Sequence, residues 1–120
     1  MPDQDAIATA LAYQDGIAVL AVGGDVDLAT VPALEAAIDE ALVSKPTGLV
    51  IDLSEVGFLA SAGLQALVAT HNNVSESAQF AVVANSAATS RPIQLTGLDH
   101  IFELYPTLDE ALTAVRANAE

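Results

Sequence analysis

The spacing of apolar residues along this chain switches repeatedly between the period of a strand and the period of a helix. Two short apolar runs, residues 7–13 and 17–22, flank the dipeptide Asp15-Gly16. Asp-Gly between two such runs is typical of a tight turn, so the pattern predicts an antiparallel hairpin. Between residues 31 and 42, apolar side chains recur every three or four positions, which predicts a helix with one buried face.

The rest of the chain continues this switching. An apolar run interrupted only by Asp52 is expected of a strand that is buried on both faces. The further predicted strands are 49–53, 79–84 and 101–105, and the further predicted helices are 62–72, a segment between Ser90 and Gly97, and 107–115. The order β-β-α-β-α-β-α-β-α predicts an α/β fold with a mixed sheet of about five strands and about four helices, because parallel neighbours must be joined through a crossover.

Three helix starts carry recognisable signals. Thr30 is a good N-cap for the first helix, and Thr107 with Glu110 forms a capping box for the last one. Pro92 deep inside a helix would remove a backbone hydrogen bond and clash with the preceding turn. We therefore expect that helix to begin at Ser90, with Pro92 in its first turn.

The charge of the chain is strongly one-sided. Sixteen acidic residues face only three strong cations, Lys45, Arg91 and Arg116, which gives a formal net charge of −13. Binding to nucleic acid or to an anionic membrane surface requires neutralisation of phosphates, so neither is expected, whereas a protein partner with a basic face is. The chain has no cysteine, which excludes disulfides, thiolate metal sites and thiol redox sensing.

The length of 120 residues, with 52% hydrophobic content, leaves room for one domain whose core spans about residues 7–115. The first residues are acidic where a secretory signal would be basic. No apolar run reaches the roughly 18 residues that span a bilayer. We therefore expect a single cytoplasmic domain.

The most informative segment runs from Asp52 to Leu64 and reads Asp-Leu-Ser-Glu-Val-Gly-Phe-Leu-Ala-Ser-Ala-Gly-Leu. A strand-like run turns there through small residues into a helix that is predicted to open behind Ser61, with Ser61 as its N-cap. A hydroxyl in that position faces backbone N–H groups and the positive end of the helix dipole. Both favour an added phosphate.

This segment resembles the signature of the STAS domains of bacterial anti-sigma factor antagonists, which reads acidic-Leu-x-x-Val-x-Phe-hydrophobic-Asp-Ser-x-Gly-Leu. Two further stretches match the same family in the same order: residues 24–27, Gly-Asp-Val-Asp, and residues 95–98, Leu-Thr-Gly-Leu. The resemblance covers residues 7–115 and is greatest with the mycobacterial and actinobacterial antagonists. It implies one STAS domain for residues 1–120.

The resemblance also implies a regulator without catalytic activity of its own. Ser61 would be phosphorylated by a partner kinase, and the unphosphorylated domain would bind an anti-sigma factor of the serine-kinase type and so release the sigma factor. The implied partner surface comprises Asp27, Phe58, Leu59, Ala60, Ser61, Ala62 and Gly63, together with the exposed side of the helix that follows Ser61. ATP would be bound by the partner, because this chain has no glycine-rich loop followed by a lysine.

One position departs from the family signature. Ala60 stands where an aspartate usually precedes the serine. The alanine removes a carboxylate that would repel a phosphate, and it also removes a contact that the kinase could recognise.

Two other functions stay open from the sequence. A STAS module also serves as the small cytoplasmic subunit of a lipid-transporting ABC system, or as a stressosome scaffold. A small hydrolase using Ser61 is the other interpretation, but a nucleophile elbow needs Gly-x-Ser-x-Gly and only Gly63 is correctly placed. His71 lies too far along the same helix to act as its base.

Acidic residues at three places raise the question of a cation site. Asp25, Asp27 and Asp52 supply the oxygen ligands that divalent cations prefer, yet they have no regular ligand spacing. We therefore expect no metal and no cofactor.

Overall fold

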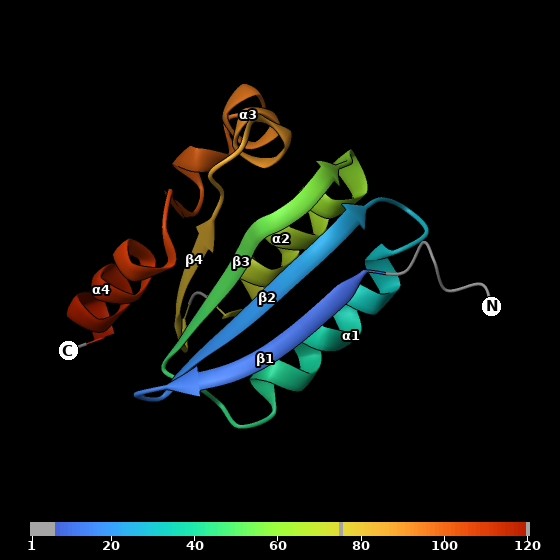
Figure 1. Cartoon of the computed structure of the whole chain (residues 1–120). Helices are drawn as coiled ribbons and strands as arrows, with labels where there is room; N and C mark the ends of the chain where they lie inside the picture. The colour runs from blue at the N-terminus through green and yellow to red at the C-terminus, as the bar shows by residue number, and fades with distance from the viewer. Residues whose placement is uncertain (1–6, 75, 120) are drawn as a thin grey trace.

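One mixed sheet forms the centre of the structure (Figure 1). This computed structural model describes residues 7–74 and 76–119. The five strands lie in the sheet in the order of the chain: β1 (Ala8–Gln14), β2 (Ile17–Val26), β3 (Gly48–Leu59), β4 (Gln79–Val83) and β5 (Glu103–Tyr105). β1 and β2 pair antiparallel, and every other neighbouring pair is parallel. The predicted element order and the mixed sheet are confirmed.

Helices cover both faces of this sheet. They are α1 (Val31–Leu42), α2 (Ser61–Val74), α3 (Ala87–Leu95) and α4 (Leu108–Ala119), with a 3-10 turn, η2 (Leu98–His100), after α3. On one face, Leu34 of α1 and Leu67 of α2 join Ile51 of β3 in the larger core cluster. On the other face lies α4 (Figure 1), whose Leu112 belongs to the smaller core cluster with Val50 of β3. The central strand is therefore buried on both faces, as its apolar run predicts.

The turn between β1 and β2 is the predicted two-residue hairpin loop. Asp15 and Gly16 have positive φ angles of 55° and 82°, which both central residues of a type I′ turn require. Pairing then continues without a register shift from Gln14–Ile17 to Ala8–Gly23.

The strand β3 is much longer than the predicted 49–53. It pairs with β4 only as far as Asp52, opposite Val83, but it continues along β2 until Leu59 lies opposite Val26. Pairing with β2 imposes strand geometry on residues 54–58, whose composition alone does not indicate it. β2 and β3 thus project beyond β4 as a two-stranded ribbon.

The predicted start of α3 at Ser90 is wrong. The helix begins at Ala87, with Ser86 as its N-cap, so Pro92 lies inside it. The Ser86 carbonyl accepts hydrogen bonds from the backbone N–H groups of Thr89 and Ser90, at 3.2 and 2.8 Å, which closes the first turn well before the proline. A single missing N–H in so short a helix is therefore tolerated.

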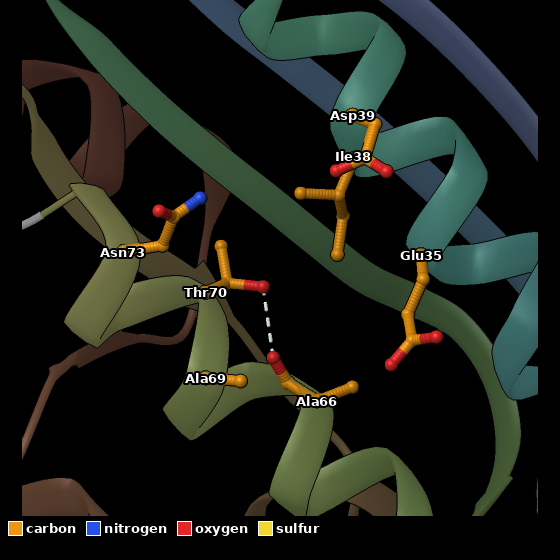
Figure 2. Close-up of a pocket in the computed structure, with 7 residues that line it drawn as sticks. All are labelled: Glu35, Ile38, Asp39, Ala66, Ala69, Thr70 and Asn73. Carbon is orange, nitrogen blue, oxygen red and sulfur yellow. Dashed lines mark hydrogen bonds between the residues drawn. The ribbon is translucent and has the colours of Figure 1, made fainter.

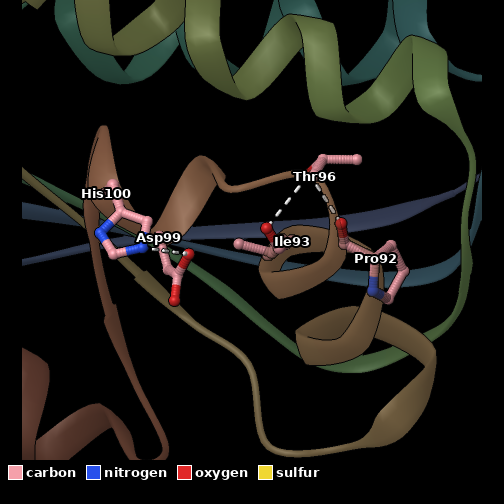
Figure 3. Close-up of polar contacts among 5 residues, drawn as sticks. All are labelled: Pro92, Ile93, Thr96, Asp99 and His100. Carbon is pink, nitrogen blue, oxygen red and sulfur yellow. Dashed lines mark hydrogen bonds and ion pairs between the residues drawn. The ribbon is translucent and has the colours of Figure 1, made fainter.

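The end of α3 agrees with the prediction. The Thr96 hydroxyl lies 2.7 Å from the Pro92 carbonyl oxygen and 3.1 Å from that of Ile93 (Figure 3). Gly97 follows in the left-handed conformation, with a φ of 77°, and ends the helix. The chain then turns back toward α2 through η2.

Within residues 7–74 and 76–119, no helix combines the length and the apolar character needed to cross a membrane.

Candidate functional site

The candidate site lies where β2 and β3 end. Parallel strands deliver the residues that follow them to one edge of a sheet, and ligands of open α/β sheets commonly bind there. Asp27 follows β2, and Ser61 follows β3 after a single residue, Ala60. The Ala60 N–H donates a hydrogen bond of 2.8 Å to the Val26 carbonyl, which ties the two strand ends together.

Ser61 is the first residue of α2 and is exposed. Its expected role as N-cap is wrong, because the carbonyl of Ala60 already accepts the N–H groups of Gly63 and Leu64, at 2.9 and 3.1 Å. Ala60 is thus the N-cap, one residue earlier than expected, and it has no side-chain oxygen with which to cap. Among the described residues, the Ser61 hydroxyl makes no hydrogen bond, so it is free to be modified beside the positive end of the helix dipole.

Gly63 allows α2 to start this close to the strands. A Cβ atom on Gly63 would lie 2.6 Å from Cγ1 of Val26 and 2.7 Å from Cδ1 of Leu59, closer than carbon atoms approach one another. The missing side chain therefore sets the depth of the first helical turn, and with it the position of Ser61.

Asp27 shapes the loop between β2 and α1. Its carboxylate accepts the backbone N–H groups of Ala29 and Thr30, at 3.0 and 3.1 Å. The predicted capping bond from the Thr30 side chain is absent: its hydroxyl instead accepts the Asp27 N–H and donates to the Asp25 carbonyl, both at 2.9 Å. The loop needs both side chains for its own backbone, so Asp27 is a structural residue as well as a partly exposed one.

The predicted partner surface divides into exposed and buried members. Ser61 and Phe58 are exposed, the latter to 52%, and Asp27, Ala60 and Ala62 are partly exposed. By contrast, Leu59 and Gly63 are buried. These two residues support the surface from beneath and cannot contact a partner directly with their side chains.

Sequence reasoning missed an exposed leucine beside this surface. Leu28 lies in the loop after Asp27 and is 80% exposed. A single exposed leucine is common on protein surfaces, so Leu28 gains interest only from following Asp27 directly in the chain. The sequence does contain a signal for it: Leu28 is the one large apolar residue in a loop that is otherwise made of small and polar residues.

A groove that starts at Ser61 was also missed. It runs along α2 and is closed on its far side by the turn after α3, with a volume of about 440 Å³. Its lining is mostly apolar and consists of Ser61, Leu64, Gln65, Val68, Ala69, Asn72, Thr96 and Leu98. The motif at residues 95–98 supplies its far wall, which gives that motif a place in the site.

A second hollow, of about 300 Å³, lies between α1 and α2, away from Ser61 (Figure 2). Glu35 and Asp39 stand on its α1 side, and the Thr70 hydroxyl on its α2 side is bonded to the Ala66 carbonyl at 2.8 Å. Neither carboxylate forms an ion pair within the described part of the chain. This side of the molecule therefore presents negative charge.

The structure does not bring the three aspartates together. In the described ranges, no three of the Asp, Glu and His side chains form a group suited to a metal ion. Asp52 instead accepts hydrogen bonds from the N–H and hydroxyl of Ser54. His71 packs against Phe80, with ring centroids 6.1 Å apart, and lies ten residues after Ser61, about 15 Å along the helix axis.

Comparison with known proteins agrees with this architecture. The STAS domain family model matches residues 9–111. The anti-sigma-F factor antagonist RsfB of Mycobacterium tuberculosis is 50% identical over 116 residues, which cover 97% of this chain and 95% of RsfB.

Solved structures extend the comparison. An anti-sigma factor antagonist from Mycobacterium paratuberculosis is 52% identical, with a TM-score of 0.90 over 94% of this chain and 97% of that one. The Bacillus protein SpoIIAA in its phosphorylated form, at 19% identity and a TM-score of 0.66 over 90% of this chain and 99% of that one, shares the fold. The chain belongs to the STAS domain family and groups within it with the mycobacterial anti-sigma factor antagonists.

Proposed function

We propose that this protein is an anti-sigma factor antagonist that is switched by phosphorylation of Ser61. The observation that carries the proposal is the free, exposed hydroxyl of Ser61 on the first turn of α2, at the mouth of an apolar groove. The name of RsfB, to which half of the residues are identical, supports the kind of partner.

The proposed partner surface around Ser61 is largely apolar. Phe58 and Leu28 expose apolar area near the two strand ends, and Ser61 itself lines the apolar groove. A partner that covers this surface must remove water from Ser61 itself. A phosphate there would add about −1.5 to −2 charges, which must be desolvated inside an otherwise apolar contact.

The partner would be an anti-sigma factor of the serine-kinase type, and the complex would form in the cytoplasm. The kinase activity and the bound ATP would belong to that partner. This chain would act as a binding protein, and His71 is no base for Ser61: it packs against Phe80 toward the far end of α2, about 15 Å along the helix axis. The unphosphorylated domain would hold the anti-sigma factor and so leave the sigma factor free.

The acidic charge predicts how the two proteins meet. A net charge of −13 attracts a partner with a basic face over a distance that salt shortens to roughly 8 Å at physiological ionic strength. We expect the association rate to fall steeply with added salt while the dissociation rate changes little. Stopped-flow binding at several salt concentrations measures both rates. An association rate that does not change with salt concentration would mean that the negative charge contributes to solubility and not to partner binding.

Capture of partners by the native chain tests the proposed function. The purified protein, immobilised and exposed to cytoplasmic extract, should retain an ATPase of the histidine-kinase-like fold, identified by mass spectrometry. The Ser61→Glu variant is the matched control and should retain much less of it. Retention of an ABC ATPase or of stressosome proteins instead would assign the domain to the alternative STAS roles.

A further inference from the structure

The two edges of the sheet differ in how they are protected. β5 is three residues long, carries Glu103 and is followed at once by Pro106. Short length, charge and proline are the usual means by which proteins prevent a sheet edge from pairing with another chain. β1, on the opposite edge, has seven residues and contains neither a charge nor a proline.

The open edge of β1 is also regular. Its pairing with β2 has no register shift, and all of its residues except the partly buried Leu11 are exposed. Within the described residues, no strand lies beyond it (Figure 1). A regular, uncharged strand edge of this kind is a template for further pairing.

The hairpin loop fixes which backbone groups of β1 face outward. Gln14 and Ile17 flank the two-residue turn, and the pair that flanks such a turn is hydrogen-bonded. Hydrogen-bonded and non-bonded pairs alternate along an antiparallel ladder, so Ala12, Ala10 and Ala8 also bond to β2. The N–H and C=O groups of the intervening residues point away from the sheet: Thr9, Leu11 and Tyr13.

We propose that β1 pairs antiparallel with β1 of a second copy of this chain, with Leu11 on the two-fold axis. This register places Leu11 opposite Leu11 of the second copy, and Thr9 opposite Tyr13 of the second copy. Every outward backbone group between residues 9 and 13 then finds a partner, because each hydrogen-bonded pair exchanges both of its bonds. The two sheets join into one continuous sheet.

The local charge favours a second copy as the occupant. Two molecules of net charge −13 repel, and screening confines that repulsion to charges close to the contact. β1 itself is uncharged, and Asp15 at its turn is paired with Arg116 at 3.0 Å. An uncharged edge offers a basic protein partner no charge to pair with directly, whereas an identical strand can match it group for group in a two-fold arrangement.

The side chains permit the approach. The Tyr13 hydroxyl reaches back toward α1 and lies 3.4 Å from the Ala41 carbonyl oxygen. Alanines occupy three positions on the other face of β1, so the side chains there are small where the two sheets would meet. β2 separates β1 from the strand that leads to Ser61, so the pairing leaves the candidate site open.

Sedimentation and amide exchange, each measured from micromolar to millimolar concentration, test this pairing. We expect the mass to rise to that of a dimer. We also expect exchange at the amides of Thr9, Leu11 and Tyr13 to slow as concentration rises, while exchange at Ala10 and Ala12 stays constant.

A proline placed on the open edge gives the matched variant. Thr9→Pro removes an outward N–H but no bond to β2, and proline is tolerated at such edge positions. Because the two-fold axis uses this N–H twice, the dissociation constant of the dimer should rise about tenfold or more. At low concentration, where the parent is also a monomer, the thermal melt should be unchanged. Thr9→Ala keeps the N–H and should dimerise like the parent.

Three results would each overturn the pairing. The first is a monomer at every concentration. The second is a dimer that Thr9→Pro leaves intact. The third is slowing of the outward amides only when an anti-sigma factor is added, which would assign the edge to that partner.

Discussion

Replacing Ser61 by glutamate is expected to remove most of the affinity for the anti-sigma factor while the fold survives. At a helix N-terminus an added negative charge is typically favourable by about 0.3–1 kcal/mol, so the melting temperature should stay within a few degrees. In the complex the same charge must be desolvated at the mouth of the apolar groove, at the edge of the sheet that also carries the partly exposed Asp27. Such a charge at an interface costs several kcal/mol of binding free energy. This loss exceeds the small gain in folding free energy at the helix N-terminus.

Ser61→Ala tests whether binding of the anti-sigma factor needs the Ser61 hydroxyl, separately from its phosphorylation. The alanine removes no capping bond, because Ala60 and not Ser61 is the N-cap, so stability should be nearly unchanged. The variant should bind the anti-sigma factor like the parent but resist inactivation by ATP. For both variants, titration calorimetry measures the affinity for the anti-sigma factor, and a thermal melt measures the stability of the fold. If Ser61→Glu binds as tightly as the parent, Ser61 is not the switch.

The largest expected loss of stability comes from Gly63→Ala. The new methyl group would meet the rigid side chain of Val26 at 2.6 Å, beneath the first turn of α2. Overpacking of this kind typically costs about 1–3 kcal/mol, against roughly 0.8–1 kcal/mol that alanine gains over glycine in a helix. We therefore expect a net loss of stability, a melting temperature lowered by several degrees, and weaker partner binding because Ser61 is displaced.

Gly57→Ala is the matched control for that substitution. Gly57 lies on the exposed part of β3, and a Cβ atom there would meet only Oδ1 of Asp25, at an ordinary 3.5 Å. This variant should melt at or above the temperature of the parent. Equal melting temperatures for Gly63→Ala and Gly57→Ala would show that the close approach of α2 is not needed.

Much of the fold could be predicted from local pattern. The hairpin follows from Asp15-Gly16, and the final helix from Thr107, whose hydroxyl accepts the Glu110 N–H at 3.2 Å, one of the two bonds of a capping box. These signals lie within a few residues of the structure that they determine. They need no knowledge of the rest of the chain.

Features that depend on distant contacts could not be predicted. The extension of β3 to Leu59 is imposed by β2. The early start of α3 is different, because its bonds to the Ser86 carbonyl are local; the predicted start is wrong because it places Pro92 in the first turn of the helix. The site shows the same division. Ser61 and its loop follow from one motif, whereas the groove needs Leu98 to be brought back against α2 from another part of the chain.

The position of the phosphate tests the central claim most directly. The chain is incubated with its purified anti-sigma factor and ATP, and the modified residue is mapped by mass spectrometry. Ser54 already donates its hydroxyl to Asp52, and Ser90 donates its own to the Ser86 carbonyl, whereas the Ser61 hydroxyl is free and exposed. We expect phosphate on Ser61 alone, none in Ser61→Ala, and none without the partner. Phosphate mainly on another residue, or phosphate added by this chain alone, would contradict the account.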